Sequence, residues 1–167
     1  CVLMPKYQMV ANSGLEFRRL DLEIHIPMGD KRVRGILEET RLPGSRVPVY
    51  VVVNEAYYDR PGLYGENGTD YADNLERFVF FCRMVLECLP KLGFQPNIVH
   101  CNDWQTALIP VYLKTLQQSK RFYAQAKTLY TFHNLPYQGI FPKSQFPLLG
   151  LNWDVFTIDG LEYYDQI

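Results

Sequence analysis

The sequence has no long apolar run and no excess of charge of either sign. No stretch of its 167 residues approaches the roughly 20 apolar residues that a membrane-spanning helix needs. The 17 Lys and Arg residues are balanced by 18 Asp and Glu residues, so the formal net charge is -1. Nucleic acids and anionic membranes are bound through basic surfaces, so we expect neither as a partner.

The first residues also lack the pattern of a signal peptide, which needs a charged leader followed by a long apolar stretch. The chain opens on Cys1 instead of Met, inside an apparent strand, and it stops inside an apparent helix. Hydrophobic residues make up 47% and charged residues 21%, the balance of a soluble globular domain. We therefore expect residues 1–167 to form a single, partial domain that is trimmed at both ends.

Several motifs of well-defined chemistry are missing. The sequence holds no GxxxxGK(S/T) phosphate loop, no GxGxxG turn after a strand, no GxSxG nucleophile turn and no HExxH motif. It has no Cys/His cluster with metal-ligand spacing, and paired carboxylates for glycoside hydrolysis are not obvious. These absences argue against P-loop and dinucleotide-binding proteins, serine hydrolases and zinc enzymes, and we expect no metal site.

The four cysteines, Cys1, Cys82, Cys88 and Cys101, form no CxxC pair. Cys82 and Cys88 stand six residues apart on a predicted helix, so their side chains face different directions. Free, buried thiols are the simplest interpretation, and they are typical of a reducing compartment. The sequence therefore favours a cytoplasmic or plastid-like location.

Aromatic residues are plentiful, with 12 Tyr and 10 Phe, and many of the tyrosines lie in segments rich in Gly, Pro and Asn. Rings on loops cover the flat faces of sugars or bases, while the tyrosine hydroxyl is left free to form hydrogen bonds. Tyrosine is also a good anchor for a half-buried loop. Composition alone leaves both interpretations open.

The first third of the chain has the period-two pattern of strands. Apolar and polar residues alternate over residues 16–26 and 31–40, and a Pro43-Gly44 turn precedes a third segment at residues 47–53. The third segment is nearly all apolar, as in a strand that is covered on both faces. We therefore expect an antiparallel hairpin region and a buried strand.

The rest of the chain predicts a long helix and then a strand–helix–strand unit. Apolar residues at three- and four-residue spacing over residues 71–92 predict an amphipathic helix that ends at a glycine. Strands at residues 97–101 and 128–133 flank a helix from about residue 104 to 116, which we expect Pro110 to kink. This spacing requires parallel strands, so the predicted fold class is α/β with an antiparallel hairpin inserted early.

Polar side chains follow both of the predicted parallel strands. Asp103 comes directly after the first strand, and His133 closes the second. Ligands of open α/β sheets bind at the carboxyl ends of the strands, so neighbouring strands would direct Asp103 and His133 into one crevice. Asp103 is also suited to capping the helix that follows it. A lone histidine is more often a core residue, and for His100, in mid-strand, we favour that interpretation.

Two segments resemble the paired motifs of the bacterial glycogen synthase and plant starch synthase family: HCNDWQTALIPVYLK and TFHNLPYQGIFP. The upstream segments YYDRPGLYG and DYADNLERFVFFCR resemble the preceding block of the same family, in the same order and at similar spacing. Further matches are VLMPKY near the front, and LGLNWD and GLEYYDQI near the end. The resemblance therefore runs over nearly the whole chain.

The resemblance implies the N-terminal half of a GT-B-type glycosyltransferase. In that fold two Rossmann-like domains, each with a mostly parallel sheet and helices on both faces, meet across a cleft. The N-terminal domain binds an α-glucan acceptor, and the C-terminal domain binds ADP-glucose or, less often, UDP-glucose. Glucose is added to the non-reducing end of the glucan through an α-1,4 bond, with retention at the anomeric carbon and without a metal or other cofactor.

The resemblance also implies roles for individual residues. His133 matches the histidine beside the transferred glucose, where its contacts hold the sugar while positive charge develops at the anomeric carbon. Asp103 matches the aspartate near the acceptor hydroxyl, which it would orient. The resemblance assigns the remaining wall of the site to Asn134, Tyr137, Gln138 and Gly139, and glucan contacts to Tyr58, Asp59, Tyr64, Trp104 and Gln105.

Two parts of the family pattern are missing from the sequence. It lacks the glycine-rich KTGGL-type loop that approaches the nucleotide-sugar, and it lacks the C-terminal domain with an Arg/Lys pair for the diphosphate. Asn102 stands where many bacterial members have His, although plant-type members have Asn. We therefore expect the isolated chain to be inactive. Two alternatives stay open: a non-catalytic glucan-binding module derived from the same fold, and a different nucleotide-sugar glycosyltransferase of the same architecture.

Overall fold

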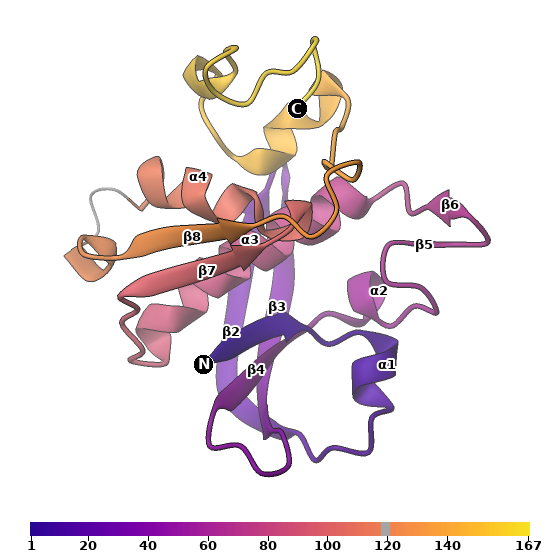
Figure 1. The fold of residues 1–167 in the computed structure, drawn as a ribbon, viewed down its shortest axis with the longest axis vertical. Helices are drawn as coiled ribbons and strands as arrows, with labels where there is room; N and C mark the ends of the chain where they lie inside the picture. The colour runs from indigo at the N-terminus through magenta and orange to yellow at the C-terminus, as the bar shows by residue number, and fades with distance from the viewer. Residues whose placement is uncertain (118–120) are drawn as a thin grey trace.

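The computed structural model describes residues 1–117 and 121–167. Its larger sheet has the strand order β1-β4-β3-β2 (Figure 1). The bounds of these strands are β1 Val2–Pro5, β2 Arg18–Met28, β3 Lys31–Arg41 and β4 Pro48–Val53. Strands β2, β3 and β4 pair in antiparallel fashion, whereas β1 and β4 are parallel. The three strands predicted between residues 16 and 53 are confirmed, with bounds that shift by no more than two residues.

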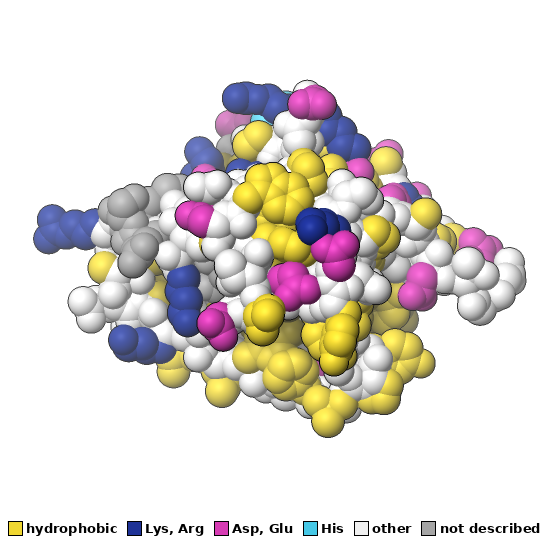
Figure 2. All heavy atoms as spheres, turned by 90° about the horizontal axis from the view of Figure 1, so that it is seen from above, with side chains coloured by type: hydrophobic (Ala, Val, Ile, Leu, Met, Phe, Trp, Pro, Cys, Tyr) yellow, Lys and Arg dark blue, Asp and Glu magenta, His cyan; other side chains and the backbone are white. Residues whose placement is uncertain are grey.

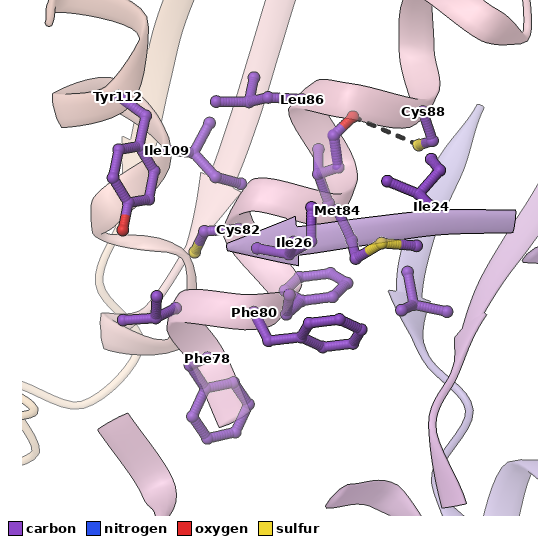
Figure 3. Packing of buried hydrophobic residues seen from close by; sticks show 14 of the residues in the cluster. Ile24, Ile26, Phe78, Phe80, Cys82, Met84, Leu86, Cys88, Ile109 and Tyr112 are labelled. Atoms are coloured by element: carbon purple, nitrogen blue, oxygen red, sulfur yellow. Dashed lines mark hydrogen bonds between the residues drawn. The ribbon is translucent and has the colours of Figure 1, made fainter. Parts of the chain in front are cut away.

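One long helix, α3 (Asn74–Lys91), packs on this sheet and lies at the centre of the core. Figure 3 shows Phe80 and Met84 of α3 beside Ile24 and Ile26 of β2. The helix lies close to the sheet because Gly35 of β3 has no side chain. A Cβ atom at Gly35 would lie 2.5 Å from Met84 Cε and 2.8 Å from Phe80 Cζ, closer than non-bonded carbon atoms approach each other.

The predicted strand–helix–strand unit packs against the same helix. Its elements are β7 (Ile98–Asn102), the 3-10 helix η1 (Trp104–Thr106), α4 (Leu108–Lys114), the 3-10 helix η2 (Arg121–Tyr123) and β8 (Lys127–Thr131). Strands β7 and β8 pair in parallel, as predicted. The single helix expected over residues 104–116 is divided into η1 and α4. The division falls within one turn before Pro110, which lies in the first turn of α4, where an N–H has no helical partner to lose.

Short elements complete the described chain: α1 (Gln8–Ala11), α2 (Glu55–Tyr58), β5 (Gly65–Glu66), β6 (Thr69–Asp70), η3 (Lys143–Leu149) and η4 (Trp153–Val155). The helix expected at the end of the chain is wrong. The last residues form turns, in which Tyr163 pairs with Gln166, and Tyr164 and Asp165 take positive φ angles that a helix excludes. Figure 2 looks down on this end of the molecule, where hydrophobic side chains reach the surface among acidic, basic and neutral ones.

Three of the four cysteines are buried and free, as predicted, whereas Cys1 is exposed. Burial raises the pKa of the Cys88 thiol to about 12 and that of the Cys101 thiol to about 11. Both thiols therefore stay protonated at neutral pH and behave as small apolar side chains. Among the described residues, no helix has both the length and the apolar character that crossing a membrane requires.

The fold class is α/β, as predicted, and the sheets are mixed. Parallel pairing among the described strands is found between β1 and β4 and between β7 and β8, and the remaining pairs are antiparallel. Helix α3 contacts β2 on one side and η1 and α4 on another, so it joins the larger sheet and the β7–β8 unit into one core. The pairing that matters for the site is that of β7 and β8, because their carboxyl ends lie side by side.

Candidate active site

The carboxyl ends of β7 and β8 bring two chain segments together. In the parallel register Asn102 lies opposite Thr131, and the pairing continues one step further, because the Asp103 N–H donates to the Thr131 carbonyl at 2.9 Å. Both strands end there, and each backbone turns away into a loop. Asp103 and His133 are therefore placed at the same edge of the sheet, as the sequence predicts.

A pair of hydrogen bonds joins these two residues. The backbone N–H of His133 donates to Asp103 Oδ1 at 2.7 Å, and His133 Nδ1 lies 2.8 Å from Asp103 Oδ2. An ionised carboxylate only accepts hydrogen bonds, so the ring proton sits on Nδ1. The other ring nitrogen, Nε2, is then a free acceptor in the neutral ring. Asp103 thus fixes both the tautomer and the orientation of His133.

The simpler interpretations of these residues are wrong. Asp103 stands at the N-cap position of η1, but its carboxylate makes no capping bond. Its backbone carbonyl takes that role and accepts from the Thr106 N–H at 3.1 Å. The His133 side chain is 61% exposed and so is no core residue. His100 is exposed as well, and its Nε2 shares a 2.8 Å hydrogen bond with Thr131 Oγ1.

The backbone of Asp103 is strained. Its φ of 57° and ψ of 179° lie in a region that is essentially reserved for glycine. Such a conformation costs on the order of 1–3 kcal/mol and persists only where surrounding contacts determine it. Here the Asp103 N–H, carbonyl and carboxylate are all hydrogen-bonded. The strain directs the carboxylate to His133 and away from the helix end that a relaxed aspartate would cap.

Hydrogen bonding also sets the charge of the pair. The bond from the His133 backbone N–H is the largest influence that lowers the pKa of Asp103, and the bond from the His133 ring adds to it. The carboxylate is therefore ionised throughout the neutral range. Burial is the main cause that raises the pKa of the nearby Tyr64 hydroxyl, and the negative charge of Asp103 adds to it. Tyr64 accordingly faces the site as a neutral hydrogen-bonding group.

A cavity of about 1030 Å³ opens beside Asp103. One wall is the loop with the β5–β6 hairpin, and the other consists of the start of η1 and the loop after β8. The lining residues are Leu63, Tyr64, Gly65, Glu66, Asn67, Gly68, Thr69, Asp70, Asp103, Trp104, Gln105, Asn134 and Tyr137. Tyr64 and Tyr137 are 41% and 68% exposed, so both rings are presented to solvent in the cavity.

The structure brings most of the residues expected for binding to this cavity. Gln138 and Gly139 line a neighbouring apolar cavity of about 410 Å³, on the other side of Trp104. Gly139 has a φ of 67°, and a Cβ atom there would lie 2.6 Å from the Trp104 ring, so this contact admits only glycine. Gly139 therefore shapes the wall by its close packing.

Besides Gln138 and Gly139, three expected residues do not line this cavity: His133, Tyr58 and Asp59. His133 is joined to it through its bonds to Asp103, which does line it. Tyr58 is completely buried in the core, and its hydroxyl donates to the Arg77 carbonyl at 2.8 Å. Asp59 is exposed at the end of α2, outside the residues that line the cavity. Conversely, the hairpin residues from Glu66 to Asp70 line the cavity, and no sequence motif predicts them. The only signal for them is the Gly- and Asn-rich composition of that segment.

Within the described residues, no three or more His, Cys, Asp or Glu side chains cluster in a way that would hold a metal ion. Asp103 and His133 form a pair without a third such group. What the pair can do is hold an imidazole beside an ionised carboxylate, in reach of an aromatic-lined cavity. That arrangement is suited to binding hydroxyl groups and to stabilising positive charge that develops nearby.

Fold and site together define an α/β protein of Rossmann-like class with its ligand cavity at the carboxyl ends of parallel strands. The chain belongs to the starch synthase catalytic domain family, whose model matches residues 1–167. The resemblance found in the sequence motifs is thus confirmed.

Relatives and a solved structure agree with this assignment. The chain is 45% identical to a glycogen synthase of Syntrophotalea carbinolica and 40% identical to one of Geotalea daltonii, covering 99% of this chain and 34% of each relative. It is similar to the catalytic domain of starch synthase IV from Arabidopsis thaliana bound to ADP and acarbose. That comparison has a TM-score of 0.83 at 26% identity and covers 99% of this chain and 34% of the other. The chain therefore spans about a third of the length of the relatives that it matches.

The backbone strain at Asp103 predicts an unusual order of stabilities. Asp103→Ala and Asp103→Gly both remove the bonds to His133, but only glycine adopts the φ and ψ of this position without strain. We expect the glycine variant to be the more stable of the two by about 1–3 kcal/mol. Urea unfolding of the purified variants measures the difference. Equal midpoints and equal slopes would show that the backbone is relaxed.

The Asp103–His133 bonds predict the titration of the carboxyl group. We expect Asp103 to titrate below its ordinary pKa of 3.8, and to keep part of that lowering in His133→Ala, because the backbone N–H is the larger cause. The bonds therefore stabilise the fold fully above pH 3.8, and this contribution is lost as the pH falls through the lowered value. Carboxyl carbon NMR measures the titration. A return to the ordinary value in His133→Ala would contradict the assigned cause.

Proposed function

We propose that this chain forms the acceptor side of a glycogen or starch synthase. The reaction is the transfer of glucose from ADP-glucose to the non-reducing end of an α-1,4-glucan, with retention at the anomeric carbon. The observation that carries the proposal is the Asp103–His133 pair beside an aromatic-lined cavity, in a chain that aligns over 99% of its length with glycogen synthases.

The cavity has the properties that a glucan requires. Its volume is at the upper end of the roughly 300–1,000 Å³ range of small-molecule sites, and its outer wall is open loop. The rings of Tyr64, Trp104 and Tyr137 suit the flat faces of sugar rings, and Gln105 and Asn134 suit their hydroxyls. Acarbose, an oligosaccharide-like ligand, is bound with ADP in the similar starch synthase IV structure, which supports both a glucan acceptor and an adenine-based donor.

The charge of the cavity favours the acceptor over the donor. Glu66, Asp70 and Asp103 are its charged residues, and among the described residues that line it there is no Lys or Arg. A diphosphate would be repelled there, whereas a neutral glucan would not. We therefore assign the diphosphate of ADP-glucose to a part of the enzyme outside these 167 residues, as the family resemblance implies.

In this mechanism His133 lies beside the transferred glucose. Asp103 holds its ring with Nδ1 protonated and adds a negative charge near the anomeric carbon, where positive charge develops in the transition state. Each Asp103 oxygen has accepted one bond from His133 and retains a lone pair, so the carboxylate can also orient the acceptor hydroxyl. The proposal includes no cofactor beyond the nucleotide-sugar, and it keeps a cytoplasmic location, or a plastid one for a plant-type parent.

The proposal is tested by removing the imidazole. In a full-length synthase that contains these 167 residues, we expect His133→Ala to lower kcat at least about a hundredfold, the size of losing one transition-state contact. The assay is glucose transfer from ADP-glucose to glycogen. His100→Ala is the matched control, because it removes the other exposed histidine of the β7–β8 pair, and we expect it to stay within about twofold of wild type.

An unchanged rate in His133→Ala, with glucan binding retained, would favour the non-catalytic glucan-binding module instead. A rate that falls equally in both histidine variants would indicate a general loss of the strand pair.

The same proposal predicts that the isolated 167-residue chain is inactive. The described residues form the acceptor cavity, and binding of the nucleotide-sugar is assigned elsewhere. We expect no glucose transfer by the purified chain under conditions in which the full-length synthase turns over. Clear turnover by the chain alone would contradict the division of the site.

A further inference from the structure

The most deeply buried charge in the described chain has no carboxylate partner. Arg77 of α3 is 0% exposed. Its Nε donates to the Tyr57 carbonyl at 2.8 Å, Nη1 to Asn74 Oδ1 at 2.6 Å and Nη2 to the Leu63 carbonyl at 3.0 Å. The guanidinium also lies 5.0 Å from the centre of the Tyr71 ring. Its hydrogen-bond acceptors are therefore all neutral groups, one each from α2, from the loop that precedes α3 and from α3 itself.

A buried arginine of this kind is costly, and apolar residues of similar size commonly stabilise a core as well or better. What an arginine offers here is a fixed geometry, because a planar guanidinium donates hydrogen bonds to several acceptors in fixed directions. In this structure two of the three acceptors are backbone carbonyls, that of Tyr57 in α2 and that of Leu63 in the loop between α2 and α3. The arginine therefore determines the path of that loop, beyond any contribution to packing.

Asn74 extends this network to the neighbouring residue. Its side chain is 2% exposed, and both of its polar atoms are used. Oδ1 accepts from Arg77, and Nδ2 donates to the Tyr64 carbonyl at 2.7 Å. The backbone N–H of Tyr71 donates to the same carbonyl at 2.8 Å. The two consecutive carbonyls of Leu63 and Tyr64 are thus held by Arg77 and Asn74.

Tyr64 is the residue that these bonds place. Its ring lines the cavity, packs 6.2 Å from the Trp104 ring and 6.3 Å from that of Phe78, and lies near the Asp103 charge. The loop around it is compact, since a Cβ atom at Gly62 would lie 1.8 Å from the Gly65 carbonyl oxygen. Small changes at Asn74 and Arg77 are therefore passed to the Tyr64 ring.

We propose that Asn74 and Arg77 are positioning residues that hold Tyr64 in the cavity and so set the affinity of the enzyme for its glucan acceptor. This inference rests on the proposed function, because it takes the ligand of the cavity to be a glucan. Neither residue touches the cavity itself. Both act through the backbone on either side of Tyr64, so their effect falls on acceptor binding and not on the chemical step.

The test uses Asn74→Asp, which changes one group in the network. The aspartate keeps an oxygen for Arg77 but replaces the N–H that Tyr64 requires by a second oxygen. In the full-length synthase we expect the KM for a malto-oligosaccharide to rise about tenfold, from the loss of one buried hydrogen bond. The kcat and the KM for ADP-glucose should stay within about threefold. Arg77→Lys, which cannot span three acceptors, should act in the same direction.

A matched control is Arg60→Gln. Arg60 belongs to the same loop and lies 4.8 Å from the Tyr71 ring, but its bonds go to Asp73 and to the Ala56 carbonyl. We expect its acceptor KM to stay within about twofold of wild type. In the Tyr64→Ala background, Asn74→Asp should add no further rise, because the residue through which it acts is gone.

A merely structural role gives a different result. Partial unfolding lowers the apparent kcat through loss of active protein and leaves the KM unchanged. That outcome, or a full effect of Asn74→Asp in the Tyr64→Ala background, would overturn the inference. Calorimetric binding of maltoheptaose to the same variants repeats the test without turnover. Failure of the proposed catalytic role is measured by the rate of His133→Ala, whereas failure of the positioning role is measured by this binding, so the two are distinguished. A Kd that rises about tenfold in Asn74→Asp supports the inference, and an unchanged Kd contradicts it.

Discussion

The site depends on the parallel register of two short strands. Asn102, the last residue of β7, pairs with Thr131, the last residue of β8. Asp103, which directly follows β7, therefore lies close to His133, the second residue after β8. The carboxylate then holds both the backbone N–H and the ring of a single residue. That double contact ties the start of η1 to the start of the loop after β8, and these two segments supply one complete wall of the cavity. A one-residue slip in the register would remove the pair and the wall together.

The opposite wall is built by a different kind of interaction. The loop that carries Tyr64 is held by the buried Arg77 and Asn74 through its backbone carbonyls. Helix α3 supplies these two residues, and it also packs against η1 through Phe78 and Trp104, whose ring centres are 4.9 Å apart. One helix therefore sets the separation of the two walls. The core around α3 therefore shapes the cavity, although its buried aliphatic residues do not line it.

The parts of this structure that follow from local patterns could be predicted from the sequence. The strands, helix α3, the parallel pair and the meeting of Asp103 with His133 all follow from periodicity and from the strand-end rule. Features that depend on tertiary contacts could not. Asp103 has the sequence signature of a helix cap, yet its backbone strain turns the carboxylate to His133. Tyr58 and Tyr64 stand six residues apart, and tertiary packing separates them. Tyr58 packs in the core against Tyr7 and Phe80, whereas Tyr64 packs on Trp104 and lines the cavity.

The charges of the site divide the work of the reaction. Transfer of glucose from a nucleotide-sugar develops positive charge at the anomeric carbon and negative charge on the departing diphosphate. The described residues around the cavity supply ionised carboxylates and neutral polar groups, so they suit the first of these charges and oppose the second. A chain with this lining gains nothing by holding the donor tightly, because the phosphates would meet Glu66, Asp70 and Asp103. Under the proposed function this lining holds a neutral acceptor, and the proposed positioning residues Asn74 and Arg77 keep its shape without adding charge to the cavity.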